Sequence, residues 1–235
     1  EERYLLTSGA SAGLAAAFNA PLAGVIFALE ELHRNFSIMV LLPSMAAAFT
    51  ATIISRAIFG RATIFDIPDL QLLPIGYYGI VILVALASGL AGVIFNWGLL
   101  NIGRFYSLPC FKRPVEKIAF ALICAGILGY FLPEVLGGGN ELINHLAKAP
   151  VSLQLLLIFL AGKLIFTLIS YGCGVPGGFF LPMLVIGALC GSICAQILIM
   201  LGWIEPAYAT NIMVVAMAAL FASSVRAPIT GTVLI

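Results

Sequence analysis

The chain has 235 residues, of which 62% are hydrophobic and only 9% are charged, and its mean hydropathy is +1.14. Soluble domains carry about 25% charged residues, so this composition excludes an ordinary soluble protein and indicates an integral membrane protein. The formal net charge of +1 lacks the strong basic bias of nucleic-acid-binding proteins, and we expect no nucleic-acid partner.

Apolar segments of two lengths follow one another along the chain. A membrane-spanning helix needs about 20 apolar residues. Five segments meet that length, at 37–57, 76–100, 116–133, 151–171 and 181–202. Four are shorter, at 5–17, 21–32, 210–222 and from 227 to the last residue. Because short helices at membrane depth are typical of transporters, we predict an all-α integral membrane protein with broken or re-entrant helices.

Two carboxylates, Glu30 and Glu31, end the apolar segment 21–32. Adjacent residues of a helix point about 100° apart, so the two side chains cannot share one face. One interpretation places them in the lipid headgroup layer, paired with Arg34. The other makes one of them a proton acceptor at the cytoplasmic end of a transport path, because ionisable groups at membrane depth are functional candidates.

Basic residues predict the orientation of the chain. The link before the segment 116–133 is rich in Lys and Arg, and the positive-inside rule makes it cytoplasmic. The links 58–75 and 134–150 then lie outside. Lys163 falls within a predicted span and is expected to face the protein interior or the aqueous side. There it either supplies a positive field near an anion route or packs against a carboxylate or backbone carbonyls.

The run Gly172–Pro182 interrupts a long apolar stretch with four glycines and two prolines. Freed backbone groups inside a membrane must be buried in protein or line a wet cavity. Pro182 stands in the first turn of the apolar segment that follows, where proline favours a helix start. The run therefore predicts a helix that begins inside the membrane and presents its N–H groups and positive dipole end to an anion.

Two segments resemble each other, 14–24 and 221–231. Each is rich in small residues and contains an Ala-Pro break between two helical stretches. Two-fold repeats of this kind place the binding site where the halves meet. We therefore assign 1–57 to the last part of a first inverted repeat, 58–75 to an external link and 76–235 to most of a second. Both ends are expected to be truncated, and half of an interface site is expected to lie outside the chain.

The five cysteines form no CxxC pair, and three of them lie in predicted spans. We interpret them as small apolar residues, and we expect no disulfide framework, metal site or cofactor.

Three runs of the sequence resemble the CLC family of chloride channels and anion/proton antiporters. They are Gly9–Gly24 followed by Glu30 and Glu31, the run Gly174–Pro182 with its G-x-F-x-P pattern, and the run Ser224–Gly231. Their order and spacing also fit the family. The resemblance covers essentially the whole chain and implies an inverted-repeat membrane fold and a homodimer with one pore per subunit.

The resemblance also implies roles for particular residues. Gly177, Gly178, Phe179 and Phe180 would hold a chloride ion near mid-membrane, with the N–H groups of the two phenylalanines as ligands. Glu31 would be the internal proton-transfer residue, and it favours a Cl−/H+ antiporter over a passive voltage-gated channel, the alternative. A fluoride- or nitrate-selective relative is a further alternative. The expected location is a bacterial inner membrane.

Three elements that the family uses are not found in residues 1–235: a serine-ligand motif, a gating glutamate and a late tyrosine ligand. They are expected to lie outside the chain. Residues 1–235 therefore do not distinguish a channel from an antiporter, and they do not identify the preferred anion.

Two hypotheses belong to other functional classes. Gly9–Gly13 matches the G-x-S-x-G nucleophile elbow, which with His145 as base would make an intramembrane serine hydrolase acting through Ser11. The elbow needs a strand before the serine, whereas the surrounding Ala and Gly residues favour close helix packing. A third hypothesis is an interaction subunit without transport.

Overall fold

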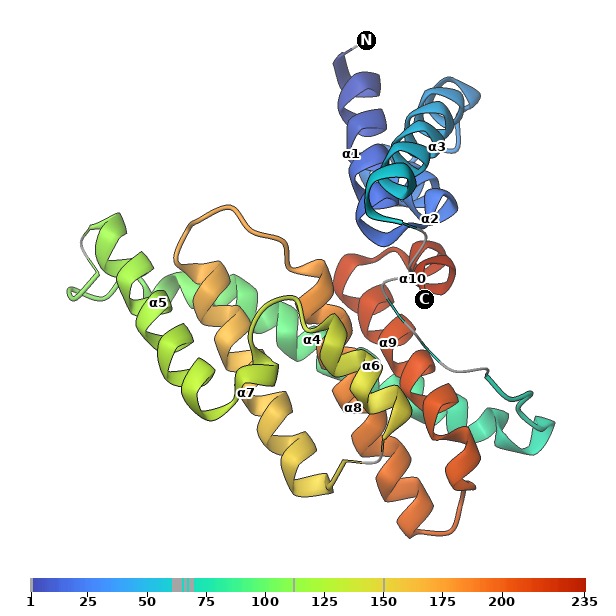
Figure 1. Ribbon diagram of the computed structural model, residues 1–235, viewed down its shortest axis with the longest axis vertical. Helices are drawn as coiled ribbons and strands as arrows, with labels where there is room; N and C mark the ends of the chain where they lie inside the picture. Colours follow the sequence, from blue (N-terminus) through green and yellow to red (C-terminus); the bar gives the residue numbers. More distant parts are fainter. Residues whose placement is uncertain (1, 61–64, 66, 68–69, 112, 150) are drawn as a thin grey trace. The chain divides into compact units, whose positions relative to one another are not determined.

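The computed structural model describes residues 2–60, 65, 67, 70–111, 113–149 and 151–235. These residues form helices and connecting loops, and no strand occurs among them (Figure 1). The α-helices are α1 Glu2–Phe18, α2 Pro21–Phe27, α3 Ile38–Phe59, α4 Tyr78–Phe105, α5 Pro114–Phe131, α6 Asn140–Lys148, α7 Leu153–Gly172, α8 Phe180–Met200, α9 Ala209–Val225 and α10 Pro228–Leu234. A π-helix, η1, covers Ala28–His33, and 3-10 turns precede α4 and α9 and follow α5.

Six segments of the described chain are long and apolar enough to cross a membrane. Five of them confirm the predicted spans within a few residues, as Ile38–Phe59, Ile75–Phe105, Pro114–Phe131, Leu153–Gly172 and Phe180–Met200. The sixth, Pro206–Val225, corrects the prediction that 210–222 is too short to span. The 3-10 turn at Pro206–Tyr208 and the polar ends of α9 extend this helix beyond its purely apolar centre.

The chain divides into two compact units, residues 1–66 with 221–235, and residues 67–220. In the first unit, α1 packs closely against α2 and α3. Gly24 permits this approach, because a Cβ atom there would lie 2.5 Å from the carbonyl oxygen of Ser11. Ser11 is itself buried in the middle of α1 and donates its hydroxyl to the carbonyl of Ser44 at 3.3 Å.

Helix α8 forms the centre of the second unit. Its residues from Met183 to Leu189 are buried, and α4, α6 and α7 contact it. Helix α9 also packs against it at two glycines. A Cβ at Gly187 would lie 2.8 Å from the Cα of Met217, and one at Gly191 would lie 2.6 Å from the Cα of Met213. Small residues thus bring two helix backbones into direct contact, as in other membrane helix pairs.

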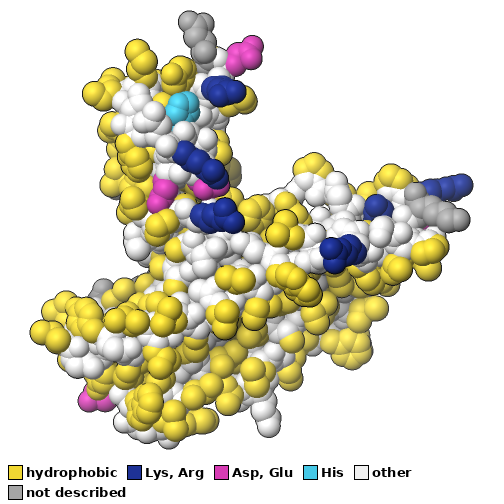
Figure 2. Space-filling model, turned by 180° about the vertical axis from the view of Figure 1, so that it is seen from behind, with side chains coloured by type: hydrophobic (Ala, Val, Ile, Leu, Met, Phe, Trp, Pro, Cys, Tyr) yellow, Lys and Arg dark blue, Asp and Glu magenta, His cyan; other side chains and the backbone are white. Residues whose placement is uncertain are grey.

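The other spans present apolar side chains outward. In α5 only 6% of the apolar window is buried within the chain, against 61% in α8. Hydrophobic side chains cover much of the visible surface in Figure 2, and charged side chains are sparse there. Such a surface is typical of contact with lipid, because soluble monomers rarely expose apolar patches of this extent.

The two Ala-Pro breaks have nearly the same local geometry, as the sequence repeat predicts. Asn19 before the first break and Arg226 before the second are both left-handed, with φ of 54° and 62°. The following residues, Ala20 and Ala227, have φ/ψ of −126°/82° and −122°/75°. Each break is preceded by a helix of 17 residues and followed by one of 7, so the first helix of each pair is longer than the sequence suggested.

The link predicted at 134–150 contains structure that the sequence analysis did not anticipate. A 3-10 turn at Pro133–Val135 leads through Gly137 and Gly139, both with positive φ, into the nine-residue helix α6. Helix α6 packs against α8. Much of the predicted link 58–75 lies outside the described residues, including its charges Arg61, Asp66 and Asp69.

Candidate functional site

The predicted anion-binding run connects α7 to α8. Helix α7 ends at Gly172, and Gly174 turns the chain with a φ of +85°. Gly177 and Gly178 are exposed in the connection, and a Cβ at Gly178 would meet open space. The backbone at these two glycines is therefore accessible within this unit, which a chain segment that contacts an ion requires.

Helix α8 begins where the sequence predicts, with Phe179 as its N-cap residue and Phe180 as its first residue. The N–H of Met183 makes the first intrahelical bond, to the carbonyl of Phe179 at 3.0 Å, and Pro182 brings no N–H. The backbone from Phe179 to Leu181 therefore forms the N-terminal end of a 21-residue helix. Such an end carries a partial positive charge of about half a unit, which attracts anions.

The two phenylalanine rings at this helix end are held by aromatic contacts. The ring of Phe179 stacks on that of Phe180 at 5.2 Å between centroids and meets the ring of Tyr171 edge-on at 5.7 Å. Because Tyr171 lies at the end of α7, these contacts tie both ends of the connection together.

The carbonyl end of α7 is anchored by a buried aromatic cluster. The hydroxyl of Tyr106 donates to the carbonyl of Ile169 at 2.8 Å, and the thiol of Cys173 donates to the carbonyl of Ser170 at 2.9 Å. Tyr106 is only 2% exposed and packs on Gly172, where a Cβ would lie 2.7 Å from its ring. Carbonyls that a helix end leaves unpaired are thus satisfied, which fixes the start of the connection to α8.

The adjacent carboxylates Glu30 and Glu31 lie in the π-helix η1, and they face different partners. Glu31 forms an ion pair with Arg34 at 3.4 Å, in which the Glu31 side chain is 26% exposed and that of Arg34 is 71% exposed. This contact matches the interpretation that pairs a carboxylate with Arg34, and it leaves the predicted proton-transfer role of Glu31 untested.

Glu30 binds the first turn of α10, a contact that the sequence analysis missed. Its carboxylate accepts the N–H groups of Ile229 at 3.0 Å and of Thr230 at 2.8 Å, and the Thr230 hydroxyl at 2.8 Å. One feature of the sequence could have indicated this contact. Ala227 precedes the helix that starts at Pro228, and its side chain cannot cap that helix. A helix start of this kind needs acceptors from elsewhere in the fold.

A cavity of about 360 Å³ adjoins the two carboxylates in the first unit. Its lining residues are Glu30, Glu31, Arg34, Phe36, Arg226 and Ile229. Arg226 is exposed at its edge. The cavity brings acidic and basic side chains to one water-accessible place.

Lys163 faces the protein interior, as predicted, and is 1% exposed. Its ammonium group donates to the carbonyls of Val135 at 2.9 Å and Gly137 at 2.8 Å. Of the two interpretations, the contacts show the one with backbone carbonyls. Lys163 therefore fixes the turn between α5 and α6 to the middle of α7.

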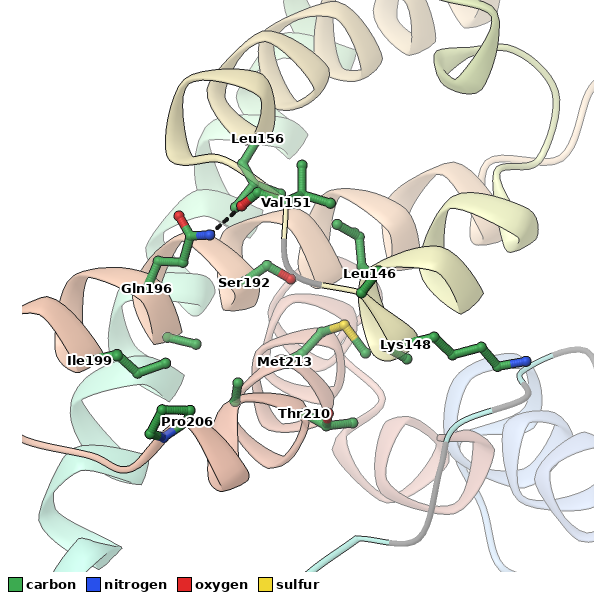
Figure 3. A pocket seen from close by; sticks show the side chains of 14 residues that line it. Leu146, Lys148, Val151, Leu156, Ser192, Gln196, Ile199, Pro206, Thr210 and Met213 are labelled. Atoms are coloured by element: carbon green, nitrogen blue, oxygen red, sulfur yellow. Dashed lines mark hydrogen bonds between the residues drawn. The ribbon is translucent and has the colours of Figure 1, made fainter.

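A second cavity, of about 300 Å³, lies between α6, α8 and α9 and contains none of the predicted site residues (Figure 3). Gln196 on its wall donates its amide N–H to the carbonyl of Val151. The buried Oε1 atom of Gln196 has no hydrogen-bond partner within the part of the chain that the structure describes.

The features considered for other chemistry occupy helical positions. Ser11 lies inside α1, without the preceding strand that a nucleophile elbow requires, and His145 lies in α6. All five cysteines are free, and Cys110 is exposed. Across the described residues, no group of three or more His, Cys, Asp or Glu side chains could hold a metal ion.

Comparison with known proteins relates the whole chain to one family. Residues 1–235 match the profile of the family described as voltage gated chloride channel. The chain is 36% identical, over 240 residues, to the H(+)/Cl(−) exchange transporter ClcA of Vibrio vulnificus, and 36% identical over 242 residues to that of Salmonella agona. Each alignment covers 98% of this chain and 50% of the relative. The chain thus spans about half the length of these curated relatives.

Solved structures give the same fold. A slow cyanobacterial Cl−/H+ antiporter matches with a TM-score of 0.89 and 31% identity, covering 98% of this chain and 55% of that one. A CLC-type fluoride/proton antiporter matches with a TM-score of 0.77 and 26% identity, covering 97% of this chain and 56% of that one. The match to these transporter structures confirms the predicted inverted-repeat transporter fold.

Proposed function

The chain belongs to the voltage gated chloride channel family, and we propose that the protein carrying it exchanges chloride for protons across a bacterial inner membrane. Six helices among the described residues are long and apolar enough to cross a membrane, so this is a multi-pass membrane protein. The names of its relatives support exchange of chloride for protons. We further propose that it acts as a homodimeric transporter and not as an enzyme.

The observation that carries this proposal is the start of α8. A buried helix of 21 residues begins at Phe180, directly after an exposed connection that contains Gly177 and Gly178. We propose that the N–H groups of Phe179 and Phe180 donate to a chloride ion there. The two glycines let the backbone approach the ion, because they carry no side chain.

The proposed ligands explain how chloride could be held and released. Backbone N–H groups and a helix dipole supply partial charges only. These partial charges offset the loss of the ion's hydration shell, and the ion contacts no full positive charge. Conduction requires binding of this intermediate strength, since an ion must also leave the site.

Protons need a separate acceptor, and Glu31 is our proposed group. It lines a cavity that is open to solvent, and its partner Arg34 is mostly exposed. A carboxylate in this place can gain a proton from water on one side of the membrane. Its ion pair with Arg34 is weak at such exposure and can open during exchange.

Chloride binding to the purified full-length protein tests the anion site. Replacing the peptide N–H of Phe180 by an ester oxygen removes one donor and keeps the side chain. We expect chloride affinity, measured by calorimetry, to fall by about tenfold, the loss of one charge-assisted hydrogen bond. The matched control, Phe180→Leu, keeps the N–H and should bind chloride much as the parent does. Equal affinities for the ester and the amide would refute the proposed ligands.

Selectivity is tested with the same protein in lipid vesicles. Chloride flux that exceeds fluoride flux is the expected result. The similarity to a fluoride/proton antiporter makes fluoride the comparison of interest. If fluoride flux is faster than chloride flux, fluoride and not chloride is the transported anion.

A further inference from the structure

Glu30 joins two segments that lie about 200 residues apart in the sequence. Its Oε1 atom accepts the N–H of Ile229 at 3.0 Å. Its Oε2 atom accepts both the N–H and the hydroxyl of Thr230, each at 2.8 Å. Thr230 is fully buried, so water does not compete for its hydroxyl. The π-helix η1 is therefore fastened to the first turn of α10.

The contact with Glu30 provides acceptors that the first turn of α10 needs. Ala227 at the N-cap has no side chain that could cap the helix, and Pro228 has no N–H. The first intrahelical bond runs from the N–H of Gly231 to the carbonyl of Ala227 at 3.0 Å. Ile229 and Thr230 supply the N–H groups that precede this bond, and Glu30 accepts both. A carboxylate at this end of the helix also interacts favourably with its dipole.

The contact determines where the neighbouring carboxylate points. Glu30 and Glu31 are consecutive residues of one π-helical turn. The bonds from α10 to Glu30 restrain the rotation of η1 about its axis, and the Glu31 carboxylate pairs with Arg34. Single π-helical turns are found frequently at functional sites.

We propose that Glu30 is a positioning residue that fixes the orientation of Glu31 for proton exchange by binding the first turn of α10. This inference rests on the proposed proton route through Glu31. It assigns the two adjacent carboxylates different tasks, one as an intramolecular helix cap and the other as the proton acceptor.

Transport by the full-length protein in vesicles tests the assignment. Glu30→Gln keeps the size of the side chain but replaces one acceptor oxygen by an NH₂ group, which faces donors from α10. We expect the number of protons moved per chloride to fall several-fold, although Glu31 is intact. Thr230→Val removes one of the three donors and should lower the ratio less. Because both changes act on one contact, Thr230→Val should add little to Glu30→Gln.

A matched control lies in the same turn. The hydroxyl of Thr232 donates to the carbonyl of Ile229 at 2.8 Å and does not contact Glu30. Thr232→Val should leave the ratio of protons to chloride unchanged. A merely structural role of Glu30 would reduce proton and chloride fluxes together and leave their ratio constant, and that result would overturn the inference.

A second measurement does not depend on transport. In a Cys110→Ser background, which removes the one cysteine that is exposed among the described residues, Glu31→Cys is labelled with a water-soluble thiol reagent. We expect Glu30→Gln to change the labelling rate at position 31 at least several-fold, because η1 is released. An unchanged rate would contradict the positioning role even if the variant transports nothing.

The proposed function and this inference fail in different ways. If Glu31→Gln keeps full proton movement, the proton route itself is wrong. If Glu31→Gln abolishes proton movement but Glu30→Gln keeps the parental ratio, only the role of Glu30 is wrong.

Discussion

Gly191 offers the sharpest test of how α8 is held in place. A Cβ atom at this position would lie 2.6 Å from the Cα of Met213, 2.7 Å from the Cβ of Ala216 and 3.1 Å from the carbonyl oxygen of Ile212. Two of these atoms belong to the backbone of α9, so no change of rotamer can relieve the clash. Restoring ordinary contact at 3.4 Å requires α8 and α9 to separate by about 0.8 Å.

A separation of this size has a calculable cost. Gaps of 0.5–1 Å forfeit about a quarter to a half of the dispersion energy between the facing atoms. Overpacking of a core typically destabilises by about 1–3 kcal/mol, and we expect Gly191→Ala to fall in that range. The matched control is Gly126→Ala in α5, where a Cβ would meet nothing within 4 Å. There the better helix propensity of alanine should stabilise by up to about 1 kcal/mol.

Thermal unfolding of both variants in detergent, beside the parent protein, measures the difference. We expect Gly191→Ala to unfold at a clearly lower temperature and Gly126→Ala at the same or a slightly higher one. Equal unfolding temperatures for the two variants would refute the close packing of α8 on α9.

Three further predictions follow from the buried polar contacts. Lys163→Met leaves the carbonyls of Val135 and Gly137 without their shared donor. Because Val135 is buried and Gly137 is exposed, the change should destabilise by about 1–3 kcal/mol, offset in part because no charge is then buried. Thermal unfolding checks this, and a more stable variant would contradict it. Tyr106→Phe removes only the hydrogen bond to the carbonyl of Ile169 and should lower the stability by about 0.5–1.5 kcal/mol in the same assay. An unchanged stability would contradict the presence of that bond. Ser11→Ala should leave transport intact, because the hydroxyl serves helix packing; lost transport with normal folding would revive a chemical role for Ser11.

Local sequence rules were sufficient for much of the fold. The length of each apolar run predicts the spans, because a helix must cross a hydrocarbon layer of fixed thickness. The start of α8 was predictable because proline and glycine act on the backbone at their own positions, as Pro182 and Gly174 do. The repeated Ala-Pro break was readable for the same reason, and Asn19 and Arg226 adopt matching left-handed conformations.

Contacts between distant residues were beyond those rules. The acceptor for the first turn of α10 is Glu30, some 200 residues away, and no local pattern connects the two. Helix α6 was missed because it is short and rich in polar residues such as Asn140 and His145, so it has no apolar run. The carbonyl partners of Lys163 became visible only once the turn at Val135–Gly137 was placed against α7.

The central claim is the exchange of chloride for protons, and a vesicle experiment tests it most directly. Vesicles that contain the full-length protein receive an outward chloride gradient, and chloride and pH electrodes record both ions at once. We predict that chloride efflux drives protons inward against their own gradient, and that Glu31→Gln stops proton movement while chloride still flows. Chloride efflux from the parent protein without any proton movement would contradict the account and identify a passive channel.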